Sequence, residues 1–102
     1  MDLNQNDWIK NSEEDHESII IDVRTQEEYN LGYIKKSILI DINQSNLFME
    51  SISNLDKRNS YYVYCRTGMR SDMACSLMNQ NGLKAYNLVG GIVQWKGEIE
   101  KN

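Results

Sequence analysis

One stretch sets the architecture of this chain, Tyr61-Tyr-Val-Tyr-Cys65-Arg-Thr-Gly-Met-Arg70-Ser71. Residues 61–64 are aromatic and β-branched, which favours a short buried strand because such side chains fill a pleated sheet well. The strand ends at Cys65. A loop over residues 66–70 follows, and a helix is predicted over residues 71–81, with a serine and an aspartate at its start as capping residues. The predicted local order is therefore strand, cysteine, tight loop and helix.

The predicted loop has the features of an anion site that would activate a thiol. Backbone N–H groups converge where such a loop meets a helix N-terminus, and the helix dipole adds partial positive charge there. Arg66 and Arg70 add two full charges. This environment stabilises a thiolate, so we expect a lowered pKa and a reactive thiol at Cys65. The alternative is a packed structural cysteine, which the two arginines and Gly68 at this spacing disfavour.

Length and charge limit the kind of protein. With 102 residues, the chain is expected to form one domain over residues 1–102. The formal net charge of −4 argues against nucleic-acid binding, and the basic loop stands out against this acidic background. No apolar run reaches membrane-spanning length, and the first residues lack the pattern of a secretory signal. We therefore expect a cytoplasmic protein that does not bind membranes.

The second cysteine and the single histidine suggest no further chemistry. Cys65 and Cys75 do not resemble a disulfide framework, and we expect Cys75 to be a packed side chain because nothing electropositive surrounds it. His16 lies in the charged stretch 12–17, which we interpret as a surface loop. A single histidine excludes multi-histidine metal sites and gives no support to a Cys/His dyad, so the sequence predicts no metal centre.

Short strands and short helices alternate along the chain. Residues 18–23 form the clearest strand, which is continuously apolar as parallel strands covered on both faces are, and we expect it at the centre of the sheet. The other predicted elements are an edge strand at Leu3, a helix capped by Asn6 or Asp7, a strand at 38–40, a partly helical stretch at 47–52, a strand at 85–89, and a closing helix with Ile92, Trp95 and Ile99. This alternation predicts a parallel α/β sheet, whose sites lie beyond the carboxyl ends of the strands.

A turn with its own capping signal follows the strand at 18–23. Thr25 and Glu28 form a Thr-x-x-Glu capping box for a short helix, and Gly32 supplies its end. Arg24 and Glu28 are close enough in sequence to pair. We interpret both as structural residues that fix the turn rather than as substrate contacts.

Together, four motifs resemble a single-domain rhodanese in order and spacing over residues 18–97. They are Ile21-Asp22-Val23-Arg24 with Glu28-Tyr29, Gly32-Tyr33-Ile34, Tyr64-Cys65-Arg66-Thr67-Gly68-Met69-Arg70-Ser71, and Leu88-Val89-Gly90-Gly91-Ile92 with Trp95. The resemblance implies a small α/β rhodanese-like fold, in which a central parallel sheet of about five short strands is flanked by helices on both faces.

The resemblance also implies a thiosulfate sulfurtransferase. Cys65 would attack the outer sulfur of a small anionic donor such as thiosulfate, become a persulfide, and pass the sulfur to cyanide or to a small or protein thiol. The donor anion would be held by the loop residues Arg66, Thr67, Gly68, Met69 and Arg70. Such catalysis needs neither a metal nor an organic cofactor.

Some residues depart from the family pattern, and other functions stay open. Asp72 stands where the family usually has a small residue, and its carboxylate would compete with an anion for the helix dipole. Tyr33, Ser37 and Asp41 replace the family's usual turn residues. The alternatives are a persulfide carrier for a protein partner, a non-catalytic rhodanese-like binding module, and a phosphatase or arsenate reductase. Only four residues separate Cys65 and Arg70, one fewer than in the phosphatases that resemble this fold, which argues against the last alternative.

Overall fold

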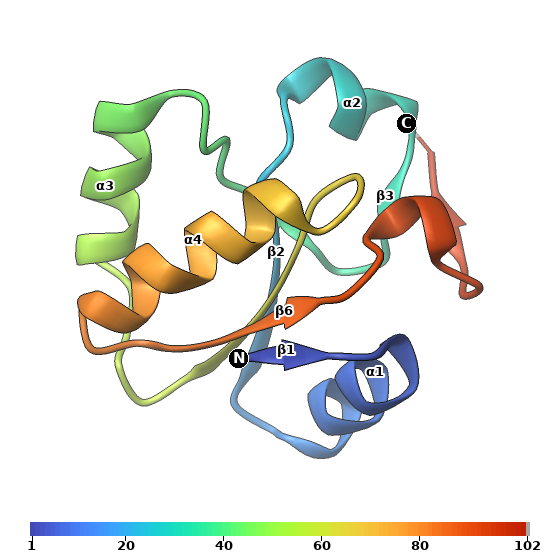
Figure 1. Ribbon diagram of the computed structural model, residues 1–102, viewed down its shortest axis with the longest axis horizontal. Helices are drawn as coiled ribbons and strands as arrows, with labels where there is room; N and C mark the ends of the chain where they lie inside the picture. Colours follow the sequence, from blue (N-terminus) through green and yellow to red (C-terminus); the bar gives the residue numbers. More distant parts are fainter. Residues whose placement is uncertain (102) are drawn as a thin grey trace.

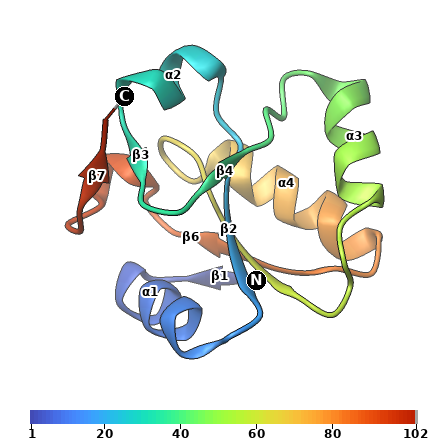
Figure 2. The ribbon, with the colours of Figure 1, turned by 180° about the vertical axis from the view of Figure 1, so that it is seen from behind.

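The structure is a computed structural model and describes residues 1–101. Its strands are β1 (Asp2–Leu3), β2 (Ser18–Asp22), β3 (Tyr33–Ile34), β4 (Ile38–Leu39), β5 (Ser60–Tyr64), β6 (Lys84–Leu88) and β7 (Ile99–Glu100). Its helices are α1 (Gln5–Glu14), α2 (Gln26–Leu31), α3 (Ser45–Ser53) and α4 (Met69–Gln80), with a 3-10 turn η1 (Ile92–Gln94). Five strands form a parallel sheet in the order β1-β6-β5-β2-β4, and β3 and β7 form a separate antiparallel pair (Figures 1 and 2).

The middle strand, β5, separates two apolar cores. Tyr61 and Val63 lie in the larger core together with Cys65, whereas Tyr62 and Tyr64 lie in the smaller one. This division follows from the alternation of side chains along a strand. Every residue of β5 is buried, as expected for a parallel strand that is covered on both faces.

Helices cover both faces of the sheet. The larger core is closed by α3 and α4 through Phe48, Ile52, Ala74, Cys75 and Met78. The smaller core is closed by α1 through the fully buried Trp8, whose ring makes edge contacts with Tyr62, Tyr64 and Trp95. The predicted α/β fold, with a five-stranded parallel sheet flanked by helices, is therefore confirmed. Within residues 1–101, no helix is both long enough and apolar enough to cross a membrane.

The predicted strands are present, but the strand expected at the centre of the sheet, β2, lies one position away from it. β2 pairs with β5 on one side and with β4 on the other, so β5 and not β2 is the central strand. The carboxyl ends of β2 and β5 point to the same edge of the sheet, where the loop after β5 faces α2 (Figure 1). The edge strand at Leu3 and the helix around 47–52 are confirmed as β1 and α3.

The predicted closing helix is wrong. Residues 92–94 make only a 3-10 turn, Trp95 is extended, and Ile99 pairs with Ile34 in the β3/β7 ladder. The apolar spacing of 92, 95 and 99 reflects packing rather than a helix, because Ile92 and Trp95 join the smaller core from an irregular segment. At the other end, α1 is capped by Asn4 instead of Asn6 or Asp7 and extends to Glu14, so the charged stretch 12–17 is partly helical.

Candidate functional site

The loop after β5 is shorter than the sequence suggests. Gly68, with a φ of 104°, is the N-cap of α4. The helix therefore begins at Met69 and not at residue 71. The left-handed conformation turns the chain into the helix at once, and glycine adopts it without steric cost. Ser71 is therefore a buried residue in the first turn of α4 and not a cap. Of the predicted loop, only Arg66, Thr67 and Gly68 precede the helix.

The sulfur of Cys65 lies at the carboxyl end of β5 and receives hydrogen bonds from this turn. The backbone N–H of Gly68 donates to Sγ at 3.1 Å, and the Ser71 hydroxyl lies 3.4 Å from it. Burial raises the pKa of the Cys65 thiol, but hydrogen bonds from Ser71, Gly68 and Thr67 outweigh burial and hold this pKa below its ordinary value. Cys65 is only 1% exposed, yet its sulfur faces hydrogen-bond donors that favour the thiolate.

Ser71 connects Cys65 to a buried polar network that sequence analysis missed. The Ser71 hydroxyl is also within hydrogen-bond distance of Asn87 Oδ1, at the end of β6. Asn87 Nδ2 donates to Asp2 Oδ1 at 3.1 Å and to the Gly68 carbonyl at 3.2 Å, so both amide hydrogens have acceptors. The Ser71 hydroxyl has one hydrogen and two acceptors. Its hydrogen can therefore point to the sulfur or to Asn87, but not fully to both.

Arg70 is committed to an ion pair with α2. Its guanidinium donates to both carboxylate oxygens of Glu28, at 2.7 and 2.8 Å. Hydrogen bonds from Arg70 lower the pKa of Glu28 to about 2, so this carboxylate is charged at neutral pH. The expected role of Arg70 as a free cation for an anionic donor is therefore weakened, because a carboxylate already occupies its fork.

The predicted pairing of Arg24 with Glu28 is wrong. Arg24 is buried and pairs with Asp22 at 2.7 Å, and it also donates to the Gly32 carbonyl at 2.7 Å. The structural interpretation of this turn nevertheless holds. Thr25 and Glu28 form the predicted capping box, and Gly32 is the C-cap of α2. Glu28 therefore caps α2 with one oxygen while both oxygens hold Arg70.

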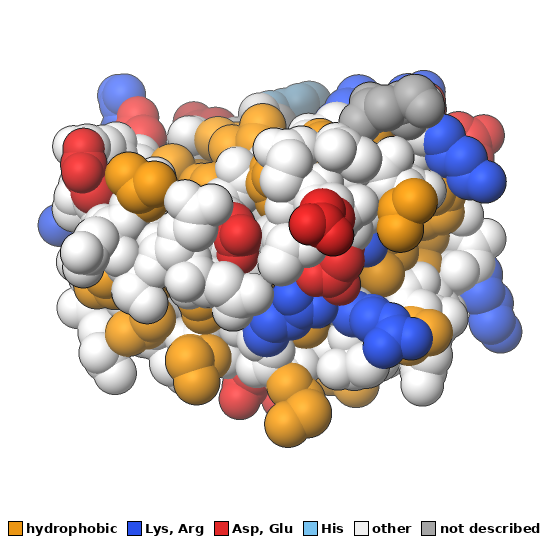
Figure 3. All heavy atoms as spheres, turned by 90° about the horizontal axis from the view of Figure 1, so that it is seen from above, with side chains coloured by type: hydrophobic (Ala, Val, Ile, Leu, Met, Phe, Trp, Pro, Cys, Tyr) orange, Lys and Arg blue, Asp and Glu red, His pale blue; other side chains and the backbone are white. Residues whose placement is uncertain are grey.

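The other predicted site residues lie at the surface. Arg66, Thr67 and Met69 are exposed, and Asp72 is exposed in the first turn of α4. Among residues 1–101, Arg66 takes part in none of the ion pairs. Figure 3 shows the molecule of Figure 1 from above. Basic and acidic side chains are in contact near the middle of the face seen in this view.

The segment after β6 holds the loop in place from behind. Ile92 N–H donates to the Cys65 carbonyl at 2.9 Å, and Val93 N–H donates to the Arg66 carbonyl at 3.1 Å. This close approach requires Gly91, because a Cβ atom there would overlap the backbone of Arg66. Gly91 of the Gly90-Gly91 pair is thus explained by a backbone contact with the cysteine loop.

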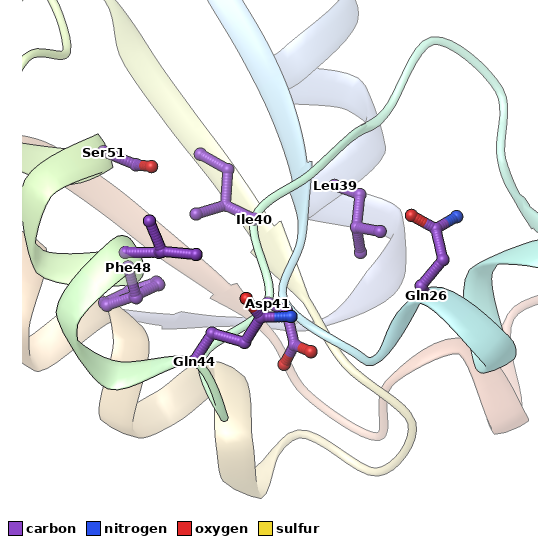
Figure 4. A pocket seen from close by; sticks show the side chains of 8 residues that line it. Gln26, Leu39, Ile40, Asp41, Gln44, Phe48 and Ser51 are labelled. Atoms are coloured by element: carbon purple, nitrogen blue, oxygen red, sulfur yellow. The ribbon is translucent and has the colours of Figure 1, made fainter.

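Two clefts lie at this end of the sheet. One, of about 310 Å³, borders the cysteine loop and is lined by Arg24, Glu28, Leu31, Gly32, Arg66, Ile92, Val93 and Ile99. The other, of about 220 Å³, lies between the start of α2, the segment after β4, and α3, and is lined by Gln26, Leu39, Ile40, Asp41, Gln44, Leu47, Phe48 and Ser51 (Figure 4). Only the first cleft includes a residue of the cysteine loop.

The second cysteine is structural, as predicted. Cys75 is 2% exposed and packs in the larger core. Burial raises the pKa of its thiol to about 12, so it is protonated at neutral pH. Cys65 and Cys75 are therefore similarly buried, but the pKa of Cys65 is lowered whereas that of Cys75 is raised.

Comparison with known proteins gives one consistent result. The model of the family described as rhodanese-like domain matches residues 5–98. The chain is 37% identical over 88 residues to "Putative sulfurtransferase YtwF" of Bacillus subtilis, covering 86% of this chain and 82% of that protein. It is 34% identical to a tRNA sulfurtransferase of Desulfurococcus amylolyticus, but covers only 16% of that longer protein. The crystal structure of a rhodanese-like domain protein from Staphylococcus aureus superposes with a TM-score of 0.83 and 30% identity, covering 99% of this chain and 97% of that one.

Proposed function

Because this chain belongs to the rhodanese-like domain family, we propose that it is a sulfurtransferase that carries sulfane sulfur as a persulfide on Cys65. The observation that supports this role most directly is the set of hydrogen bonds that Gly68 and Ser71 direct at the Cys65 sulfur. These bonds favour the thiolate, which is the nucleophilic form. The whole chain acts in this proposal as one catalytic domain.

The first step is attack of the Cys65 thiolate on the outer sulfur of a donor. With thiosulfate as donor, a new S–S bond forms to Cys65 while the bond between the outer sulfur and the sulfonate breaks. The electron pair of that bond leaves with sulfite, and the terminal sulfur on Cys65 keeps the negative charge. Two-step covalent catalysis of this kind gives ping-pong kinetics.

The second step returns Cys65 to the thiolate. Backbone N–H groups at the start of α4 stabilise the charged terminal sulfur in the way that fixed donors stabilise an oxyanion. An acceptor thiolate or cyanide then attacks this terminal sulfur, and the electron pair of the S–S bond returns to Cys65. Neither step needs a metal or an organic cofactor.

A persulfide carrier is the second candidate function. It shares the first step, but releases its sulfur to a protein partner and turns over slowly with small acceptors. The exposed apolar side chains Leu31, Met69 and Val93, on or close to the cysteine loop, favour this candidate because such side chains suit contact with a protein. A non-catalytic module is disfavoured by the hydrogen bonds to Cys65.

The test is the intact mass of the purified chain after incubation with excess thiosulfate. We expect one added sulfur atom on Cys65, its absence in Cys65→Ser, and its retention in Cys75→Ser. An unmodified mass for the unsubstituted chain would support the binding module instead. The rate at which cyanide or a small thiol then removes the sulfur separates an enzyme from a carrier.

A further inference from the structure

The charges around Cys65 nearly cancel. Arg24 is paired with Asp22, and Arg70 is paired with Glu28, so two of the three nearby arginines are neutralised within the protein. Arg66 is exposed and has no carboxylate partner among residues 1–101. Asp72 adds an exposed negative charge in the first turn of α4. The site therefore offers one available guanidinium to a donor.

A single exposed cation is a poor match for a dianion. Thiosulfate brings two negative charges, and Arg66 alone can compensate only one of them. An exposed ion pair contributes about 0.2 to 1 kcal/mol, so Arg66 alone gives little selectivity for thiosulfate. Release of Arg70 would require breaking two charge-assisted hydrogen bonds to Glu28.

The cleft beside the loop offers contacts that thiosulfate cannot use. The apolar part of its wall is formed by Leu31, Ile92, Val93 and Ile99. The rest of its lining is Arg66, Gly32, the paired Arg24 and the paired Glu28. Its volume of about 310 Å³ lies at the small end of the range for ligand pockets. Because Ile92 and Val93 are hydrogen-bonded to the backbone of Cys65 and Arg66, this wall has a fixed position relative to the nucleophile.

We propose that the preferred sulfur donor is a small organic persulfide, R–S–SH, whose single carboxylate pairs with Arg66 and whose carbon body lies in the cleft beside Val93. This inference rests on the proposed function and specifies its donor. The Cys65 thiolate attacks the outer sulfur, a new S–S bond forms, and the bond to the inner sulfur breaks. The inner sulfur leaves with the electron pair and takes the proton of the outer sulfur, giving R–SH and a persulfide anion on Cys65.

The test compares three donors by the rate at which they add sulfur to Cys65. They are thiosulfate, N-acetylcysteine persulfide, which has one carboxylate, and the methyl ester of that persulfide, which has none. Each rate is divided by the rate of the same donor with a free small thiol, which removes differences in intrinsic reactivity. We expect N-acetylcysteine persulfide to exceed thiosulfate by about tenfold and its ester by about threefold.

Two substitutions assign these differences to the cleft. Arg66→Ala should make the acid and the ester react equally, because it removes the partner of the carboxylate. Val93→Trp should fill the cleft and lower the rate with both persulfides about fivefold, and it should lower the rate with thiosulfate much less, because thiosulfate has no carbon body to place there. Leu47→Trp is the matched control, since Leu47 and Val93 are both 59% exposed but Leu47 lines the other cleft.

The outcomes separate this inference from the proposed function. If Cys65 gains sulfur but thiosulfate has the highest normalised rate, the donor assignment is wrong and the sulfurtransferase proposal stands. If Val93→Trp and Leu47→Trp have equal effects, the cleft does not hold the donor and the inference is also wrong. If no donor adds sulfur to Cys65, both proposals fail.

Discussion

The Arg70 guanidinium binds both carboxylate oxygens of Glu28, at 2.7 and 2.8 Å, although 42 positions separate the two residues in sequence. The pair joins α2 to the first turn of α4 directly beside the cysteine loop. Sequence alone favours Arg70 over Arg66 as the donor-binding cation, because Arg70 lies at the helix start. The ion pair reverses this expectation, so we expect Arg66→Ala to weaken donor capture more than Arg70→Ala does.

Removing the charge of Glu28 should make Arg70 available to an anion. In Glu28→Gln we expect thiosulfate to add sulfur to Cys65 about two to five times faster, because the partly exposed guanidinium of Arg70 loses its carboxylate partner and can pair with the donor. Glu27→Gln is the matched control, because Glu27 is an exposed carboxylate on the same helix and removes the same net charge. The measurement is the second-order rate of persulfide formation by intact mass. Equal acceleration in both variants would mean that overall charge, and not the Arg70 pair, controls donor capture.

The same ion pair predicts a dependence of stability on pH. The pKa of Glu28 falls from its ordinary value of 4.5 to about 2 in the folded chain. A lowered folded pKa adds stability above the unfolded pKa, and this contribution is lost as the pH falls from about 4.5 towards 2. The Glu28 side chain is 27% exposed, so we expect Glu28→Gln to cost only about 1 kcal/mol at pH 7.

Urea unfolding at pH 7, 4.5 and 3 measures this contribution. The difference between the unsubstituted chain and Glu28→Gln should shrink between pH 4.5 and pH 3. A difference that stays constant over this interval would show that capping of α2, rather than the charge of Glu28, accounts for the loss of stability. Glu27→Gln again provides the comparison for a change in net charge.

The hydrogen bonds to Cys65 predict the pH dependence of its reactivity. The thiolate fraction rises with pH, so alkylation of Cys65 by iodoacetamide should reach half its maximum below the ordinary pKa of a thiol. Ser71→Ala removes one donor to the sulfur and should move this midpoint upward. Ser76→Ala, on the exposed side of α4, should leave it unchanged. A midpoint at or above the ordinary value in the unsubstituted chain would contradict the activated thiol.

Asn87 is expected to act on Cys65 through Ser71. Because Asn87 Oδ1 competes for the single hydroxyl hydrogen of Ser71, Asn87→Ala should free that hydrogen for the sulfur. We therefore expect the midpoint of alkylation to move downward, in the opposite direction to Ser71→Ala. The double variant Ser71→Ala/Asn87→Ala should behave like Ser71→Ala alone. An upward shift in Asn87→Ala would mean that Asn87 mainly positions Ser71 or the Gly68 carbonyl for the sulfur.

The sequence predicts local features of this domain well, because those features depend on residues close together in the chain. The strand before Cys65, the capping box of Thr25 and Glu28, and the packed Cys75 are examples. The partners of Glu28 and Ser71 were missed because Arg70 and Asn87 come from elements that meet only through the sheet order. An asparagine at the end of β6, among apolar residues, was the one available signal for a buried polar contact.

Elements that pack irregularly were also missed. The spacing of Ile92, Trp95 and Ile99 fits a helix, but the described structure places these residues in a 3-10 turn, an extended residue and a strand. Trp95 contacts Trp8 at 5.7 Å between ring centroids, and Ile99 pairs with Ile34. Both partners are remote in sequence, so tertiary packing and not local preference decides the conformation of this segment.

Gly91 provides a test of how the cysteine loop is held. It has a φ of 63°, and a Cβ atom there would overlap the backbone of Arg66 and Thr67. We expect Gly91→Ala to destabilise the chain by about 3 kcal/mol or more, because backbone atoms must move in addition to the strain at positive φ. Gly82→Ala is the matched control, with a φ of 84° but only the flexible Lys57 side chain nearby, and it should cost about 1 kcal/mol.

Urea unfolding compares the stability of Gly91→Ala and Gly82→Ala, and alkylation of Cys65 under native conditions reports the state of the cysteine loop. Displacement of the Arg66 carbonyl should loosen the turn that supplies the Gly68 N–H, so the alkylation midpoint of Gly91→Ala should rise while that of Gly82→Ala stays unchanged. Equal destabilisation and unchanged midpoints in both variants would show that the segment after β6 does not hold the loop in place.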